Sequence, residues 1–163
     1  MKIKSKFQNQ KIEQGVFAME RKPRILIVDD DPDFVEVTSR ILKARPYQVS
    51  AAYNGEEGVQ KIREQKPDII LLDIMMPKKD GFIVADEMSR DPSMSTIPIL
   101  AITSFVDYTG QPFPFKVSEY LPKGTKPDDL HKLVEKHLKR LGFFSDQPEP
   151  PDAFPIPEKK TKD

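Results

Sequence analysis

Short runs of consecutive apolar residues recur along the middle of the chain and predict buried β-strands. The runs are Ile25–Val28, Ile69–Leu72 and Ile97–Ile102, the last of which is interrupted only by Pro98. None of them alternates apolar with polar positions, as a half-exposed strand would. Continuous apolar strands are typical of a parallel sheet that is covered on both faces. Weaker strand candidates are Tyr47–Ala52 and Glu119–Leu121.

Helical patterns fill the intervals between these runs. Pro32 stands where proline is well tolerated, in the first turn of a helix. The inner face of that helix is predicted to contain Phe34, Val37, Thr38 and Ile41. Asn54 and Glu57 predict an N-cap and its reciprocal partner at the start of a second helix. Asp80 is predicted to cap a third helix.

A last helix is predicted to open at Pro127, because the acidic residues that follow it favour the positive end of a helix dipole. Its apolar positions are Leu130, Leu133, Val134, Leu138 and Leu141. Gly142 is placed to end this helix. Strands that alternate with helices of ten or more residues imply right-handed crossovers and an α/β fold.

Composition divides the chain into three regions. Residues 1–22 contain six basic and two acidic residues, and we expect a flexible basic extension. Met19 could serve as an alternative start, in which case the first 18 residues would not be native. Residues 143–163 contain five prolines, which oppose regular structure and predict a disordered tail. Residues 23–142 remain as one domain.

Several classes of function are disfavoured by composition. The chain has no cysteine, which excludes disulfides, thiolate metal sites and cysteine nucleophiles. Its formal net charge is zero, so no overall field attracts nucleic acid, and we expect no DNA-binding segment after the domain. No apolar run approaches the roughly 20 residues that a membrane-spanning helix needs. We therefore expect a cytoplasmic protein that neither binds DNA directly nor inserts into a membrane.

Chemically useful side chains follow four of the predicted strands. They are Asp29, Asp30 and Asp31 after the first strand, Asp73 after the third, Thr103 and Ser104 after the fourth, and Lys123 after the fifth. Taken singly, each aspartate is as well explained as a turn former or a helix cap, and Asp31 before Pro32 is best explained that way. Because ligands bind beyond the carboxyl ends of parallel strands, the combination is more informative than any member.

The types of side chain at this edge suit phosphoryl transfer. Neighbouring carboxylates repel one another unless a cation relieves them, and Mg²⁺ prefers oxygen ligands. Asp73 would then be the acceptor nucleophile, Lys123 a second cation, and Thr103 a donor to a phosphoryl oxygen. His131 and His137 are interpreted as packing or solvated residues and not as metal ligands.

The middle of the chain resembles the receiver domain of bacterial response regulators, over about 120 residues and in the order of that family. The matching segments are ILIVDDDP (25–32), NGEEG (54–58), PDIILLDIMMPKKDGF (67–82), PILAITS (98–104) and YLPKGTKPDDL (120–130). The resemblance implies a flavodoxin-like, doubly wound parallel sheet of five strands in the order 2-1-3-4-5.

The resemblance also implies a role for each matching residue. Asp29 and Asp30 correspond to the acidic pair that holds Mg²⁺, and Asp73 to the phosphorylated aspartate. The other correspondences are Met75 for the backbone carbonyl that binds the metal, Thr103 for the switch hydroxyl, Tyr120 for the switch aromatic, and Lys123 for the lysine that pairs with the aspartate or its phosphoryl group.

The function implied is that of a phosphoacceptor signalling domain. The donor would be a sensor histidine kinase or a phosphotransfer protein, and the signal would pass to an unknown downstream protein by contact. Self-phosphorylation and autodephosphorylation would be the only enzymatic activities. Phosphorylation adds charge and acceptor oxygens, which can bias a two-state element.

Two segments depart from the family pattern. Gly124 stands where the family usually has proline after the lysine. In 104–119, SFVDYTGQPFPFKVSE, a glycine and two prolines oppose the family's fourth helix, which we expect to be short or missing. The segment 105–118 reflects either drift or an apolar surface that binds a specific protein.

Two other functions remain open at this point. The chain could be a receiver-like binding module that no longer depends on phosphorylation, which the two departures favour. It could instead be a Mg²⁺-dependent phosphohydrolase, but such enzymes often need an acid two residues after the nucleophile. That position is Met75, which cannot transfer a proton. Neither of the common glycine-rich nucleotide-binding motifs is present.

Overall fold

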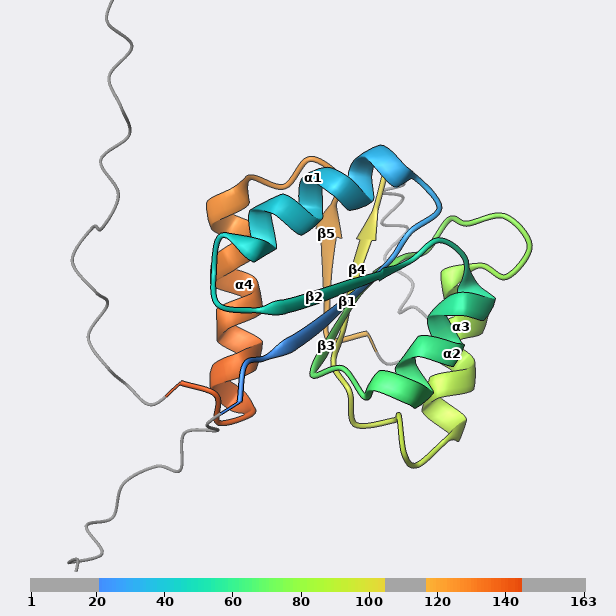
Figure 1. The fold of residues 1–163 in the computed structure, drawn as a ribbon. Coiled ribbons are helices and arrows are strands. Elements are labelled where there is room, and N and C mark those ends of the chain that lie inside the picture. Colours follow the sequence, from blue (N-terminus) through green and yellow to red (C-terminus); the bar gives the residue numbers. More distant parts are fainter. Residues whose placement is uncertain (1–20, 105–116, 145–163) are drawn as a thin grey trace, which may run out of the picture.

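Five parallel strands form a sheet in the order β2-β1-β3-β4-β5 in the computed structural model, which describes residues 21–104 and 117–144 (Figure 1). The strands are β1 (Arg24–Val28), β2 (Gln48–Ala52), β3 (Ile69–Asp73), β4 (Ile99–Thr103) and β5 (Glu119–Pro122). The helices of the described residues are α1 (Pro32–Lys43), α2 (Gly55–Gln65), α3 (Gly81–Arg90) and α4 (Pro127–Arg140). The expected α/β fold and its strand order are therefore confirmed.

The sheet is covered on both faces, which explains the continuous apolar runs. Every residue of β3 and β4 is buried. In β1, Leu26 and Val28 belong to the core cluster that includes residues of α2 and α3. The alternate residues Ile25 and Ile27 belong to the cluster that includes residues of α1 and α4, on the opposite face (Figure 1). A strand with a core on each side is apolar along its length, and the polar residues Asp73 and Thr103 stand only at the strand ends.

Three helices begin at the aspartate or asparagine caps expected from the sequence. Asp31, Asn54 and Asp80 each accept a hydrogen bond from backbone N–H groups in the first turn of α1, α2 and α3. Such a cap stabilises a protein by about 1 kcal/mol. Glu57 differs in one detail, because its carboxylate accepts a hydrogen bond from the Tyr53 N–H and not from the N–H of the cap residue.

The buried face of α1 differs from the predicted one. Val37, which was expected to point inward, is 57% exposed, whereas Val35, Thr38 and Leu42 are buried. Residues three and four positions apart share a helix face, so the way α1 lies on the sheet selects this stripe. Leu141 was likewise predicted to belong to the apolar stripe of the last helix, but it is the C-cap of α4 and is 37% exposed.

Both histidines of α4 pack in the protein interior. Of the two interpretations from the sequence, packing is therefore right and solvation is wrong. His131 is 9% exposed, and His137 is 5% exposed with its Nε2 3.3 Å from an oxygen of Glu119. Burial lowers the pKa of His131, and the nearby charge of Arg45 lowers it further. Glu135 and Asp128 act in the opposite direction, but the pKa stays below its usual value.

We expect His131 to make the protein less stable in mild acid. The unfolded chain takes up a proton near pH 6.5, but the folded protein resists protonation at this site. The free energy of unfolding should therefore fall as the pH drops below about 6.5. Urea unfolding at about pH 7.5 and about pH 5.5 measures this loss, and His131→Leu should make it smaller. An equal loss in the variant would contradict the prediction.

Arg21 links the beginning of the first described range to the end of the second. The Arg21 guanidinium makes two hydrogen bonds to Asp68, of 2.7 and 2.6 Å, and lies 4.9 Å from the centre of the Phe143 ring. Most of the predicted extension and tail, and residues 105–116 of the predicted irregular segment, lie outside the described residues. Those expectations, and the domain boundaries, stay predictions.

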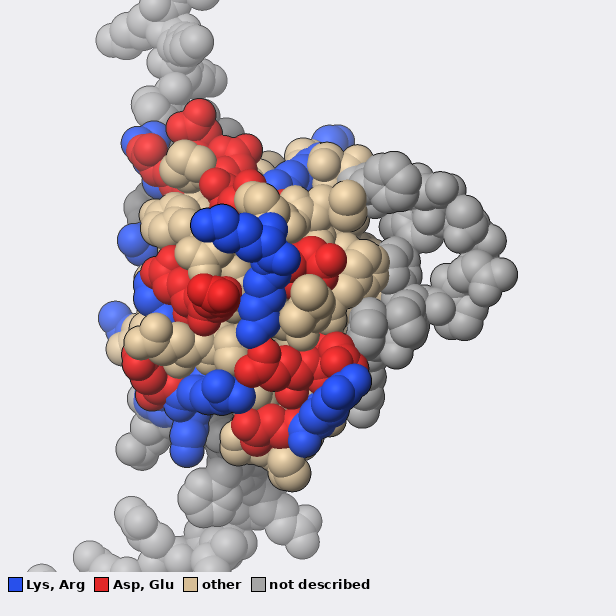
Figure 2. Space-filling model, turned by 90° about the vertical axis from the view of Figure 1, so that its right-hand side faces the viewer, with Lys and Arg blue, Asp and Glu red and all other residues tan. Residues whose placement is uncertain are grey.

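Charges of both signs are mixed on the side that carries α2 and α3 (Figure 2). Arg63 of α2 pairs with Glu87 of α3 at 2.9 Å, and Lys79 pairs with the same glutamate. Such mixing gives this side no field of a single sign. No helix in the described parts of the chain has both the length and the apolar content needed to span a bilayer.

Candidate functional site

The register of the sheet brings the predicted carboxylates together at one edge. Val28, the last residue of β1, is the parallel partner of Leu72 in β3, so Asp29 and Asp73, which follow these two residues, are neighbours. Asp29, Asp30 and Asp73 each offer a carboxylate oxygen, and these oxygens lie within 4.8 Å of one another. Asp29 and Asp73 are buried, whereas Asp30 is exposed. We call these three residues the acidic cluster.

Lys123 bridges the two buried members of the acidic cluster. Its Nζ donates to Asp29 Oδ1 at 3.0 Å and to Asp73 Oδ2 at 2.8 Å. Its backbone N–H donates to the carbonyl of Thr103 at 3.0 Å, which fixes the start of the lysine side chain at the end of β4. The lysine side chain is 19% exposed, so its ammonium group meets the carboxylates with little intervening solvent.

Backbone groups orient the same two carboxylates. The N–H of Met75 donates to Asp73 Oδ1 at 3.0 Å, and the N–H of Asp31 donates to Asp29 Oδ1 at 2.9 Å. Asp29 Oδ2 is buried and accepts no hydrogen bond, although Lys123 Nζ lies 2.8 Å away in an ion pair. A lone pair of this oxygen is therefore free for a further partner.

The electrostatics of the site reflect burial and close charge. Burial raises the pKa of Asp29, and the neighbouring charge of Asp73 adds to this effect, while the hydrogen bond from Lys123 opposes it. Burial by itself would lower the pKa of Lys123, but its hydrogen bonds to Asp29 and Asp73 raise it overall. The amine is thus held in its charged form between the two buried carboxylates.

The acidic cluster fits a hard divalent cation such as Mg²⁺. All of its donors are oxygens, and the buried Asp29 Oδ2, which accepts no hydrogen bond and has only the ion pair with Lys123, can accept a cation as well. Asp30 is open to solvent, which suits an ion that keeps several of its waters. Met75 lies two residues after Asp73 with a side chain that is 57% exposed, and metal binding by its backbone carbonyl stays a prediction.

The two predicted switch residues lie on neighbouring strands. Thr103 ends β4 and is 6% exposed. Tyr120 in β5 is the partner of Ala101, two residues before Thr103, and is half-buried against the core on the α2 and α3 face. Because side chains two residues apart in a strand share a face, Thr103 is on the same face as Tyr120. Their motion on phosphorylation stays a prediction.

The chain also holds a contact that sequence reasoning did not find. The ring of Phe34, in the first turn of α1, has its centre 4.8 Å from Lys123 Nζ. The sequence placed Phe34 only among the apolar residues of a helix. An aromatic residue next to an acidic motif could have been noted, but no local pattern links it to a lysine that follows β5.

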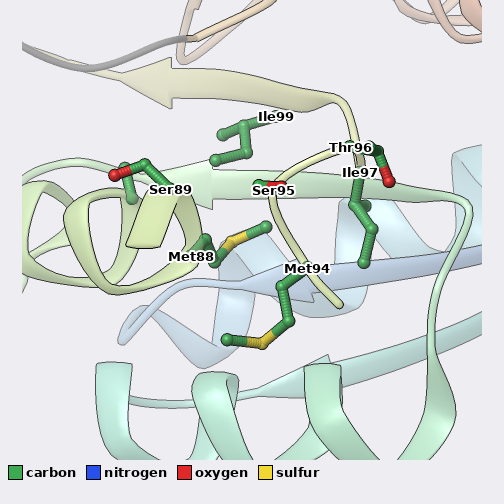
Figure 3. Close-up of a pocket in the computed structure, with 8 residues that line it drawn as sticks. Met88, Ser89, Met94, Ser95, Thr96, Ile97 and Ile99 are labelled. Atoms are coloured by element: carbon green, nitrogen blue, oxygen red, sulfur yellow. The ribbon is translucent and has the colours of Figure 1, made fainter. Parts of the chain in front are cut away.

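A separate pocket lies far from this chemistry. It has a volume of about 300 Å³ and lies between the end of α3 and the start of β4, where Met88, Met94 and Ile97 line it (Figure 3). Its lining contains no charged side chain. It is next to Ile99 at the beginning of β4, whereas the acidic cluster is near the end of that strand. The pocket therefore contributes nothing to the site.

Comparison with known proteins gives a consistent result. Residues 25–135 match the family described as "Response regulator receiver domain". Protein PilH of Pseudomonas aeruginosa is 34% identical over 117 residues, which are 71% of this chain and 97% of PilH. The DNA-binding dual master transcriptional regulator RpaA of Synechocystis is 36% identical over 116 residues, which are 70% of this chain but only 47% of RpaA.

Solved structures show the same fold. A putative response regulator from Chloroflexus aurantiacus is 31% identical, with a TM-score of 0.69 over 74% of this chain and all of that one. The response regulator TrrA of Thermotoga maritima, solved in complex with Mg²⁺–BeF, is 31% identical, with a TM-score of 0.64 over 71% of this chain and 98% of TrrA.

Proposed function

Because this chain belongs to the family of response regulator receiver domains, we propose that it accepts a phosphoryl group on Asp73 and signals by protein–protein contact. The donor would be a sensor histidine kinase or a phosphotransfer protein. One observation carries the proposal: Lys123 Nζ lies 2.8 Å from the buried Asp73 Oδ2, in an acidic cluster at the edge of the sheet. A nucleophile, a cation and metal-binding oxygens are the parts that phosphoryl transfer needs.

In the proposed reaction, a carboxylate oxygen of Asp73 attacks the phosphorus of a phosphohistidine. A P–O bond forms as the P–N bond breaks, and the released imidazole nitrogen takes a proton from solvent. Lys123 already donates a hydrogen bond to Asp73 Oδ2, so its ammonium can donate to a phosphoryl oxygen on Asp73 without a large movement. The N–H of Met75 holds the other oxygen of Asp73 in place during this step.

The acidic cluster would supply the metal site of this reaction. Asp29, Asp30 and Asp73, with the backbone carbonyl of Met75, would hold Mg²⁺, which contributes positive charge against the phosphoryl oxygens. The free lone pair of Asp29 Oδ2 and the exposure of Asp30 support this assignment.

A phosphoryl group on Asp73 would act on the two switch residues. It brings additional negative charge and acceptor oxygens to the end of β3. The hydroxyl of Thr103, at the end of the neighbouring strand, would donate to one of these oxygens. That movement would open space for the Tyr120 ring on the same face of the sheet. A local charge would in this way change a surface that a partner protein can recognise.

Acetyl phosphate provides a test that needs no kinase. With Mg²⁺ present, the protein should gain the mass of one phosphoryl group as acetate leaves. Removing Mg²⁺ with EDTA should slow the gain by about 100-fold, because the cluster then lacks the cation that relieves its negative charge. Intact-protein mass spectrometry over time measures both rates. If neither acetyl phosphate nor a panel of histidine kinases adds a phosphoryl group, the proposal fails.

A further inference from the structure

We propose that Phe34 is a positioning residue, whose ring holds the ammonium of Lys123 at the acidic cluster. Phe34 contributes no atom to the reaction and acts only through the lysine. The inference deepens the proposed function, and its effect on phosphorylation rests on that function. The contact itself can be tested without phosphorylation.

The geometry is that of a cation–π interaction. The Nζ atom lies 4.8 Å from the centre of the ring, within the roughly 6 Å over which an ammonium is attracted to an aromatic face. The same Nζ lies 2.8 Å from Asp29 and 2.8 Å from Asp73. Phe34 is held in the first turn of α1 and packs against the core on the α1 and α4 face. The ring and the two carboxylates together enclose the ammonium.

Lys123 needs this support because the backbone fixes where its side chain begins but not where its ammonium lies. Two hydrogen bonds from Thr125 to the carbonyl of Pro122, of 3.1 and 2.7 Å, close the turn that contains Gly124, but neither reaches the lysine side chain. The lysine side chain is a flexible four-carbon stem. Beyond its backbone bond to Thr103, its direction therefore depends on what its ammonium contacts.

The ring differs from the other contacts because the reaction does not alter it. When Asp73 becomes an acyl phosphate, one of its oxygens is lost as an anionic partner of Lys123. When a cation binds to the acidic cluster, Asp29 is shared between that cation and Lys123. Of the contacts given above for the ammonium, only the Phe34 ring keeps the same charge distribution throughout. The ring can therefore hold the ammonium in place while the partner of the ammonium changes from a carboxylate oxygen to a phosphoryl oxygen.

Nuclear magnetic resonance tests the contact directly. Protons next to Nζ that lie over an aromatic ring resonate upfield of those of the other lysines, and Lys123→Arg assigns the signal by its loss. We expect the upfield signal in the unmodified protein and in Phe34→Tyr, which keeps a ring. We expect it to return to the ordinary lysine position in Phe34→Leu, which keeps apolar volume but has no ring.

The rate of phosphorylation by acetyl phosphate with Mg²⁺ tests the consequence. Phe34→Leu should slow it by about three- to tenfold, which corresponds to a partly buried cation–π contact. Phe34→Tyr should stay within about twofold of the unmodified protein. Phe143→Leu is the matched control, because it removes the ring of the Arg21–Phe143 contact at the other edge of the sheet. It should leave the Lys123 signal and the rate unchanged.

The outcomes separate the two proposals. If the upfield signal is missing, or persists in Phe34→Leu, the inference is overturned. It is equally overturned if phosphorylation proceeds at the same rate in Phe34→Leu and the unmodified protein. If no variant takes a phosphoryl group but the signal follows the ring, the positioning of Lys123 stands and the proposed function fails. A loss of rate in Phe34→Leu that Phe34→Tyr does not restore points to general destabilisation and also overturns the inference.

Discussion

Replacing Asp73 with asparagine is expected to abolish phosphoryl incorporation. An amide nitrogen or oxygen is a poor nucleophile, so the acceptor is lost although the side chain keeps its shape. The N–H of Met75 can still donate to the amide oxygen, and Lys123 keeps its contact with Asp29, so the fold should persist. Intact mass after incubation with acetyl phosphate and Mg²⁺ should show no added phosphoryl group.

Asp80→Asn is the matched control for this experiment. Asp80 caps α3 through its Oδ1, and asparagine caps a helix about as well as aspartate. The control therefore makes the same chemical change close to the site, and it should be phosphorylated like the unmodified protein. Phosphoryl incorporation by Asp73→Asn would place the acceptor elsewhere. Partner binding that is the same in Asp73→Asn and in the phosphorylated protein would favour the phosphorylation-independent binding module.

Replacing Gly81 with alanine is expected to cause the largest loss of stability among the glycine substitutions. A Cβ at Gly81 would lie 2.3 Å from the carbonyl oxygen of Asp73 and 2.7 Å from the Cα of Ile74. Both atoms belong to the backbone, so no side-chain rotation relieves the clash. The N–H of Gly81 also donates to the Ile74 carbonyl at 2.9 Å, which holds the two segments together. We expect destabilisation by about 3 kcal/mol.

This substitution should also impair the site, because the clash falls on Asp73 itself. Moving α3 away, or the end of β3, displaces the acceptor relative to Lys123. Gly124→Ala is the matched control, since its Cβ would meet nothing within 4 Å and only its φ of +97° is unfavourable. We expect that variant to lose about 1 kcal/mol. Urea unfolding measures both losses, and a smaller loss for Gly81→Ala than for Gly124→Ala would refute this prediction.

The elements that the sequence predicted best are those whose signal is local: strands buried on both faces and helices with a capping residue. A strand of a parallel sheet is buried on both faces, and this leaves a continuous apolar run in β1, β3 and β4. Helix caps are formed within a few residues, so Asn54 and Asp80 could be assigned without knowing what surrounds them. Both kinds of signal are complete within a short stretch of chain.

The buried faces of the helices could be predicted only in part. Val37 and Leu141 are apolar but exposed, whereas His131 is polar but buried. A periodic pattern shows that a helix has an inner side, but the angle at which α1 or α4 lies on the sheet decides which stripe is covered. That angle depends on side chains of several strands at once.

The sequence by itself determined the fold class and the set of residues that meet at the edge of the sheet. It could do so because every parallel strand places its carboxyl end at the same edge, so chain order translates into position. Only the tertiary structure decided how those residues touch. The bridge from Lys123 to Asp29 and Asp73, the ring of Phe34 beside it, and the close approach of Gly81 to Asp73 depend on packing between separate elements. Contacts between such distant segments leave no local pattern in the sequence.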